Sequence, residues 1–332
     1  MFTLGCMTIS VLDSATAMRQ ILTVTADERA PLIRDMWAPL SGMYRFVPGG
    51  VDMADVHRQN FGFDWDLPTD QLHEGLDMLI EADAWKRVAA ALEAGISALI
   101  SAGQGGALSA ALDLPDTPIM PVTPILPEVP EIPDIAVLLV LGDPSNPHFM
   151  QEAQGLSAFG GISGYITITL WPTPQVLERL EAIVVHELHH NVRYSPGGVV
   201  WDPMTVTVGE QVIAEGLADV FATEMYGELG HAHFVSDETR GSDEVLAKVA
   251  SGLGITGMQH FTAWVHGDAS ARLFGAEPVG LPTGAGYAAG ARLAAAYLAE
   301  RGITAAQAVA APSGDVVCVA TRRLGLGGNL ED

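Results

Sequence analysis

Two histidines four residues apart, with a glutamate directly after the first, form the part of this chain best suited to chemistry: His186-Glu187-Leu188-His189-His190. On a helix this spacing places His186 and His190 on one face, one turn apart, where both could hold one zinc ion at about 2.0–2.1 Å. Glu187 would project about 100° round the helix, beside the metal and free to act on a water. The pattern predicts a metal site, with two histidines that bind no metal as the alternative.

The flanking residues predict the helix that carries this motif. Thr173 before Pro174 has the form of an N-cap followed by a proline at the first helical position, and Ser195-Pro196-Gly197-Gly198 should end the helix after Tyr194. We therefore expect one buried helix over 174–194 with its metal-binding histidines facing inward. His189 lies on the flank of this helix, where we expect partial exposure, with a contact to substrate or to a metal ligand as the alternative.

A third ligand is expected on the next helix, because catalytic zinc keeps three protein ligands and one open position. The segment 207–210, Thr-Val-Gly-Glu, has the form of a capping box and opens a predicted helix that ends near Tyr226. On this helix Glu215 could bind zinc, and Asp219, one turn later, could accept the second ring N–H of a ligating histidine. Solvated carboxylates are the alternative, which the apolar run over 212–222 disfavours because burying an unpaired charge is costly.

The motif His-Glu-x-x-His, followed by Glu-Gly-Leu-Ala-Asp at 215–219, resembles the gluzincin metallopeptidases and, more narrowly, the largely uncharacterised bacterial family of predicted zinc-dependent proteases. The resemblance extends over about 155–226, with a weaker echo in Gly-Tyr-Ala-Ala-Gly at 286–290. It implies a zincin-like metallopeptidase core, and the expected fold is α+β with a small sheet, an active-site helix and flanking helices. It assigns the zinc ligands to His186, His190 and Glu215, the general base to Glu187 and the partner of a ligand to Asp219.

The expected reaction is zinc-dependent hydrolysis of peptide bonds, in which Glu187 takes a proton from a metal-activated water and passes it to the leaving amine. Tyr287, in the family-like 286–290 segment, is the candidate for stabilising the oxyanion, although a tyrosine there could serve only packing. The rival candidates are His231, His233, His260 and His266. Two other functions stay open: a zinc hydrolase of a non-peptide amide, and a non-catalytic binding or regulatory protein that retains zinc.

A strand is expected directly before the active-site helix, because apolar and polar residues alternate over 162–170. In zinc peptidases of this general type an edge strand at this position pairs with extended substrate, which would supply affinity through main-chain hydrogen bonds. An ordinary sheet strand fits the same pattern. The short apolar run 135–141 predicts a second, buried strand.

Composition limits the partners and the compartment. A formal net charge of −24 argues against nucleic acid or an anionic membrane as partner, and either a solubilising acidic surface or a preference for cationic substrates would explain it. The expected partner is a peptide or protein substrate. Two cysteines are too few for a disulfide framework, and no segment reaches the length of a transmembrane helix, so a cytoplasmic location is expected.

Seven prolines recur at every third position between Pro115 and Pro133, which is the repeat of a polyproline II helix. This segment, 115–133, is expected to be a semi-rigid strut against the folded body, with a docking motif for a proline-binding partner as the rival interpretation. It would join a mainly helical N-terminal region, 1–114, to the zincin-like catalytic domain, 134–332.

Overall fold

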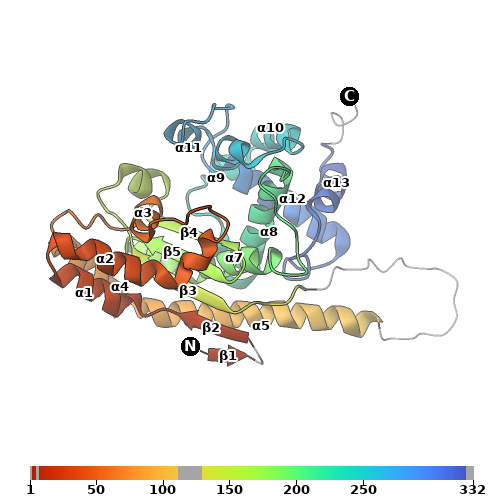
Figure 1. Ribbon diagram of the computed structural model, residues 1–332. Helices are drawn as coiled ribbons and strands as arrows, with labels where there is room; N and C mark the ends of the chain where they lie inside the picture. Colours follow the sequence, from red (N-terminus) through yellow and green to blue (C-terminus); the bar gives the residue numbers. More distant parts are fainter. Residues whose placement is uncertain (1, 5–6, 111–128, 327–332) are drawn as a thin grey trace, which may run out of the picture. The chain divides into compact units, whose positions relative to one another are not determined.

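The computed structural model describes residues 2–4, 7–110 and 129–326 and is an α+β fold, as predicted (Figure 1). Its internal contacts divide the chain into two units, 1–93 with 132–191 and 94–131 with 192–332. The proposed strut lies outside the described residues from Pro115 to residue 128, so the expected domain boundaries stay a prediction. Within the described ranges no helix combines the length and apolar character needed to cross a membrane.

The first unit contains a five-stranded sheet in the order β1-β2-β3-β5-β4. The strands are β1 (Phe2–Leu4), β2 (Met7–Val11), β3 (Ile135–Leu141), β4 (Leu156–Ile162) and β5 (Tyr165–Leu170). Strand β3 pairs in parallel with β2 and β5, whereas β1 and β4 join their neighbours antiparallel. The predicted buried strand over 135–141 is confirmed, and only Ala136 within it is partly exposed. Within the N-terminal region expected to be mainly helical, residues 2–4 and 7–11 instead form β1 and β2.

Strand β5 is an interior strand and not the edge strand considered from the sequence. Its register with β3 pairs Leu139 with Ile168, and β4 covers its other side. Thr167 and Thr169 are buried as well as the isoleucines, because both faces of β5 are covered, as is usual for a strand with a parallel neighbour. Among the described strands, β4 is therefore the edge strand on this side of the sheet.

Helices pack around this sheet in the first unit. They are α1 (Ser14–Thr23), α2 (Ala26–Trp37), α3 (Met53–Gln59), α4 (Asp70–Glu81), the start of α5 (Ala84–Ala110), α6 (Pro174–Glu178) and most of α7 (Leu180–Arg193), with helical turns at Ala38–Tyr44 and His148–Glu152. The predicted N-cap is confirmed, since the Thr173 hydroxyl accepts a hydrogen bond from Val176 N–H at 3.2 Å.

The single helix predicted over 174–194 is instead two helices, α6 and α7, which meet at Arg179. A continuous helix would offer the Leu177 carbonyl to the N–H of Glu181, four residues later. In the structure that carbonyl accepts from Arg87 Nη2 at 2.5 Å, and the Glu181 carboxylate forms an ion pair with the same guanidinium at 2.6 Å. The carbonyl at the junction of the two helices thus has a hydrogen-bond partner 90 positions away in the chain.

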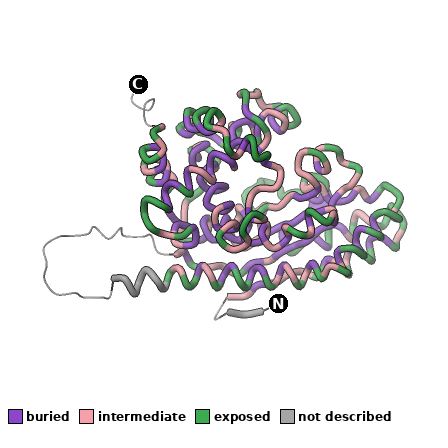
Figure 2. Tube along the Cα trace, turned by 180° about the vertical axis from the view of Figure 1, so that it is seen from behind, coloured by how far each residue is buried: buried purple, intermediate pink, exposed green. Residues whose placement is uncertain are grey.

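The second unit is helical. It contains α8 (Val208–Tyr226), α9 (Asp237–Gly241), α10 (Asp243–Gly252), α11 (Asp268–Leu273), α12 (Ala285–Arg301) and α13 (Ser313–Arg323), with helical turns at Gly227–Gly230, Met258–His260 and Thr262–His266. Helix α8 begins and ends as predicted, and 13 of its 19 residues are buried. Figure 2 shows buried and exposed residues along the whole described trace. It packs closely on α12, where Gly216 faces Gly290.

Candidate metal centre

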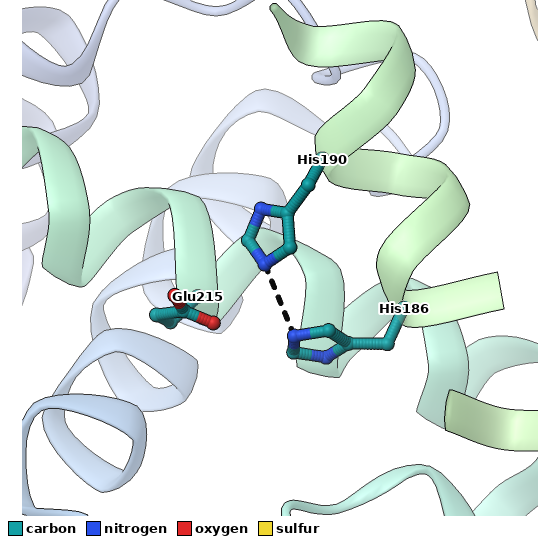
Figure 3. A group of neighbouring side chains, drawn as sticks. All are labelled: His186, His190 and Glu215. Atoms are coloured by element: carbon teal, nitrogen blue, oxygen red, sulfur yellow. Dashed lines mark hydrogen bonds between the residues drawn. The ribbon is translucent and has the colours of Figure 1, made fainter. Parts of the chain in front are cut away.

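Helix α7 presents His186 and His190 one turn apart, as the four-residue spacing predicts (Figure 3). Both side chains are buried, and their Nε2 atoms lie 3.1 Å apart. Two nitrogens bound to one tetrahedral zinc at 2.0–2.1 Å are separated by about 3.4 Å. The helix therefore already holds the two imidazoles close to the spacing that a shared zinc ion requires.

Glu215 of α8 is the third member of this group. The ligand atoms of His186, His190 and Glu215 all lie within 4.8 Å of one another, and all three residues are buried. Gln211, one turn earlier on α8, donates a hydrogen bond to Glu215 Oε1 at 2.8 Å and so holds the carboxylate in place. Two imidazoles and one carboxylate are a donor set that suits catalytic zinc, and the predicted ligands are therefore brought together.

Glu187 is buried on α7 beside the first histidine. Strand β4 passes directly against this point of the helix, because a Cβ atom on Gly160 would lie only 2.2 Å from the Glu187 carbonyl oxygen. Only glycine permits such a close approach of strand to helix. The predicted exposure of His189 is wrong, since its side chain is completely buried.

Asp219 is buried on α8, one turn after Glu215, as the sequence spacing requires. Its Oδ2 accepts a long hydrogen bond from Ala232 N–H at 3.4 Å, which brings the segment that carries His231 and His233 to this part of α8. The predicted role of Asp219 in orienting a ligating histidine stays a prediction.

Tyr287 lies in the first turn of α12, within an aromatic cluster of the second unit. Its ring packs edge-on against Phe234 at a centroid distance of 5.0 Å, and the ring of His266 lies 5.8 Å away. Phe234 in turn contacts His233. Two of the rival candidates for oxyanion stabilisation thus share one cluster with Tyr287, whereas His260 lies in the separate turn Met258–His260.

Two polar side chains that follow the histidine motif on α7 have a role that the sequence did not indicate. The first is Asn191, which is fully buried. Its Nδ2 donates to the carbonyls of Gly160, Ile162 and Tyr165 at 2.8–3.0 Å, and its Oδ1 accepts from Gly164 N–H at 2.9 Å. These bonds fix the β4–β5 hairpin to the metal-binding helix, and nothing in the local sequence indicates such distant acceptors.

The second missed residue is Arg193, whose guanidinium binds Glu210. The sequence assigns Glu210 to a capping box, and half of that prediction is confirmed: the Thr207 hydroxyl accepts from Glu210 N–H at 3.0 Å. The reciprocal bond is replaced, because the Glu210 carboxylate accepts from Arg193 Nε and Nη2 and from the Tyr194 hydroxyl instead.

The protein is thus an α+β protein with a candidate metal centre: α7 presents two histidines on neighbouring turns, and α8 presents a glutamate beside them. A family model described as Predicted Zn-dependent protease (DUF2268) matches residues 124–318, and because this is more than half of the chain, the protein belongs to that family. The predicted resemblance to the family of predicted zinc-dependent proteases is thereby confirmed.

One similar curated protein carries the name Uncharacterized protein YjfC and comes from Bacillus subtilis (strain 168). It is 33% identical over 168 residues, which cover 49% of this chain and 54% of the relative. The chain therefore spans about half the length of that relative. No solved structure gives a significant match.

Proposed function

We propose that this protein is a zinc-dependent peptidase of gluzincin type, with His186, His190 and Glu215 as zinc ligands and Glu187 as general base. The observation that carries the proposal is the convergence of three buried ligand atoms within 4.8 Å, beside a buried glutamate. Membership of a family named for predicted zinc-dependent proteolysis supports it.

Zinc bound by these residues would supply Lewis acidity, which lowers the pKa of a water and polarises a carbonyl. The chain's own groups would do the remaining work. Glu187 accepts the proton of the attacking water and delivers it to the nitrogen of the leaving amine, so that one carboxylate acts first as base and then as acid. Tyr287 is proposed to donate a hydrogen bond to the developing oxyanion, and Asp219 to hold the tautomer of a ligating histidine.

Peptides would bind in extended form along β4. Among the described strands β4 pairs on one side only, and Gly160 brings it into direct contact with α7 at Glu187. Main-chain hydrogen bonds to such an edge tolerate many side chains, so β4 would provide affinity without narrow selectivity. The acidic charge and the low cysteine content support a further proposal: a peptide or protein substrate in a reducing, cytoplasmic compartment, with no nucleic acid or membrane as partner.

The test is cleavage profiling of a diverse peptide mixture by mass spectrometry, comparing the wild type with Glu187→Gln under identical zinc-replete conditions. This variant keeps all three proposed ligands, so it should bind zinc and lose cleavage. A His186→Ala, His190→Ala double variant should lose the metal itself, which we expect at about one zinc per chain in the wild type.

Cuts made only by the wild type would establish peptidase activity. Bound zinc without any difference between wild type and Glu187→Gln would contradict the peptidase proposal and favour a non-peptide amide or a binding function. Absence of zinc after reconstitution of the wild type would overturn the metal site.

A further inference from the structure

A buried ion pair lies just beyond the candidate ligands and takes no part in the proposed chemistry. The Arg193 side chain is completely buried, and that of Glu210 is 9% exposed. The guanidinium donates to both carboxylate oxygens at 2.9–3.0 Å, in the bidentate geometry that suits arginine. Its Nη1 also donates to the carbonyls of Val309 and Ala311 at 3.0 Å. The Tyr194 hydroxyl completes the group with a bond to Glu210 at 3.0 Å.

The Arg193 guanidinium stays charged in a setting that opposes charge. Burial alone would lower the pKa of Arg193, but the Glu210 carboxylate outweighs it and raises that pKa. Burial and the same carboxylate raise the pKa of Tyr194, so its hydroxyl keeps its proton and remains a donor. A buried ion pair is commonly no more stabilising than apolar side chains of similar size, so net stability is a weak explanation for its presence.

The positions of the two partners give a better explanation. Arg193 is the last residue of α7, less than one turn after His190, and Glu210 is in the first turn of α8, five residues before Glu215. The bidentate ion pair has a defined orientation, so it limits both rotation and translation of the end of α7 relative to the start of α8. The carbonyls of Val309 and Ala311, in the segment before α13, accept further hydrogen bonds from the same guanidinium.

We propose that Arg193 and Glu210 are positioning residues that hold the α7 and α8 ligands at zinc-binding distance. This inference rests on the metal site proposed above and deepens it. A rigid ion pair would fix the separation of ligands from two helices before metal arrives, so that zinc binding need not order the helices. The expected loss on removing the pair is about tenfold or more in zinc affinity, the scale seen when groups that support metal ligands are removed.

The discriminating variant is the double substitution Arg193→Met with Glu210→Leu, which replaces the ion pair by apolar side chains without leaving a lone buried charge. Arg193→Lys is the second variant, because it keeps the positive charge and loses the bidentate hydrogen bonding. The matched control is Arg87→Met with Glu181→Leu. Arg87 also makes a bidentate ion pair with a glutamate of α7 and a hydrogen bond to a backbone carbonyl, but its partner Glu181 lies at the opposite end of α7 from Arg193.

Zinc dissociation constants would be measured by competition with a chromophoric chelator, with the visible spectrum of the cobalt-substituted protein as a report on ligand geometry and thermal melts as a report on folding. We expect the Arg193/Glu210 double variant to melt near the wild-type temperature, bind zinc about tenfold more weakly or worse, and show an altered cobalt spectrum. Arg193→Lys should shift both readouts in the same direction, and this keeps the proposal testable if the double variant does not fold. The Arg87/Glu181 control should leave affinity and spectrum unchanged.

Folded variants at Arg193 that bind zinc as tightly as the wild type, with an unchanged cobalt spectrum, would overturn the positioning role. An equal loss of affinity in the Arg87/Glu181 control would overturn it too, because any loosening of α7 would then suffice. A wild type that binds no zinc would instead refute the proposed function, so the two failures are distinguishable.

Discussion

Substituting Gly216 by alanine tests how closely α8 and α12 must pack. A Cβ atom on Gly216 would lie 2.1 Å from the carbonyl carbon and oxygen of Gly290, and one on Gly290 would lie 2.1 Å from the Val212 oxygen. Non-bonded carbon atoms prefer separations of about 3.5–4.0 Å. Because the obstructing atoms belong to the backbone, no side chain can rotate away, and the two helices would have to separate by about 1.5 Å.

The expected cost follows from two opposing effects. Overpacking a close contact costs about 1–3 kcal/mol, and the upper end applies here because backbone must move. Alanine in place of glycine within a helix returns about 1 kcal/mol. Gly216→Ala should therefore lower the free energy of unfolding by about 2 kcal/mol, which corresponds to a fall in Tm of about 4–8 °C for a unit of 150–250 residues.

The assay is urea and thermal unfolding of Gly216→Ala beside Gly314→Ala. Gly314 is an exposed helical glycine in α13 where an added Cβ meets nothing within 4 Å, so alanine there should be neutral or stabilise by up to about 1 kcal/mol. Because Gly216 adjoins Glu215, zinc affinity should fall as well. Unfolding energies for Gly216→Ala within about 0.5 kcal/mol of the wild type would refute the close-packing argument.

Two further predictions concern buried polar groups of the first unit. The fully buried His57 accepts from Trp37 Nε1 at 3.0 Å and contacts the Phe63 carbonyl, and burial lowers its pKa to about 4. Because the folded pKa lies below the unfolded value of 6.5, the neutral ring stabilises the fold above pH 6.5, and about 3 kcal/mol is lost as the pH falls towards 4. Unfolding free energies of His57→Gln should therefore depend less on pH between 7 and 4 than those of the wild type, and equal slopes would contradict this. Asn191→Leu removes the hydrogen bonds of this amide to the β4–β5 hairpin, which amount to about three full bonds because two N–H protons are shared among three carbonyls. At about 1 kcal/mol per bond the change should cost about 3 kcal/mol in urea unfolding, and a loss below 1 kcal/mol would show that the hairpin holds its position without it.

Several features of the site could be predicted from the sequence because each depends on residues within one or two helical turns. The four-residue spacing of His186 and His190 sets their common face on any helix, and the Thr207 cap and Gly227 stop bound α8 with little help from the rest of the chain. The apolar run of β3 likewise requires a buried strand wherever it is placed. Local hydrogen bonds and fixed side-chain periodicity encode these features directly.

Other features required the tertiary structure, because each depends on groups far apart in the chain. The predicted helix is interrupted at Arg179, where the Leu177 carbonyl accepts from Arg87, 90 residues away, and the partners of β5 decide that β4, not β5, is the outer strand on this side of the described sheet. Glu210 carries the signature of a capping box, yet its carboxylate binds Arg193, because two bonds from a cationic guanidinium outweigh the single bond that the Thr207 N–H could donate. The sequence alone determined which residues can bind a metal and on which helices they lie. Only the tertiary structure decided which buried contacts surround those residues, because long-range packing has no periodic signature in the chain.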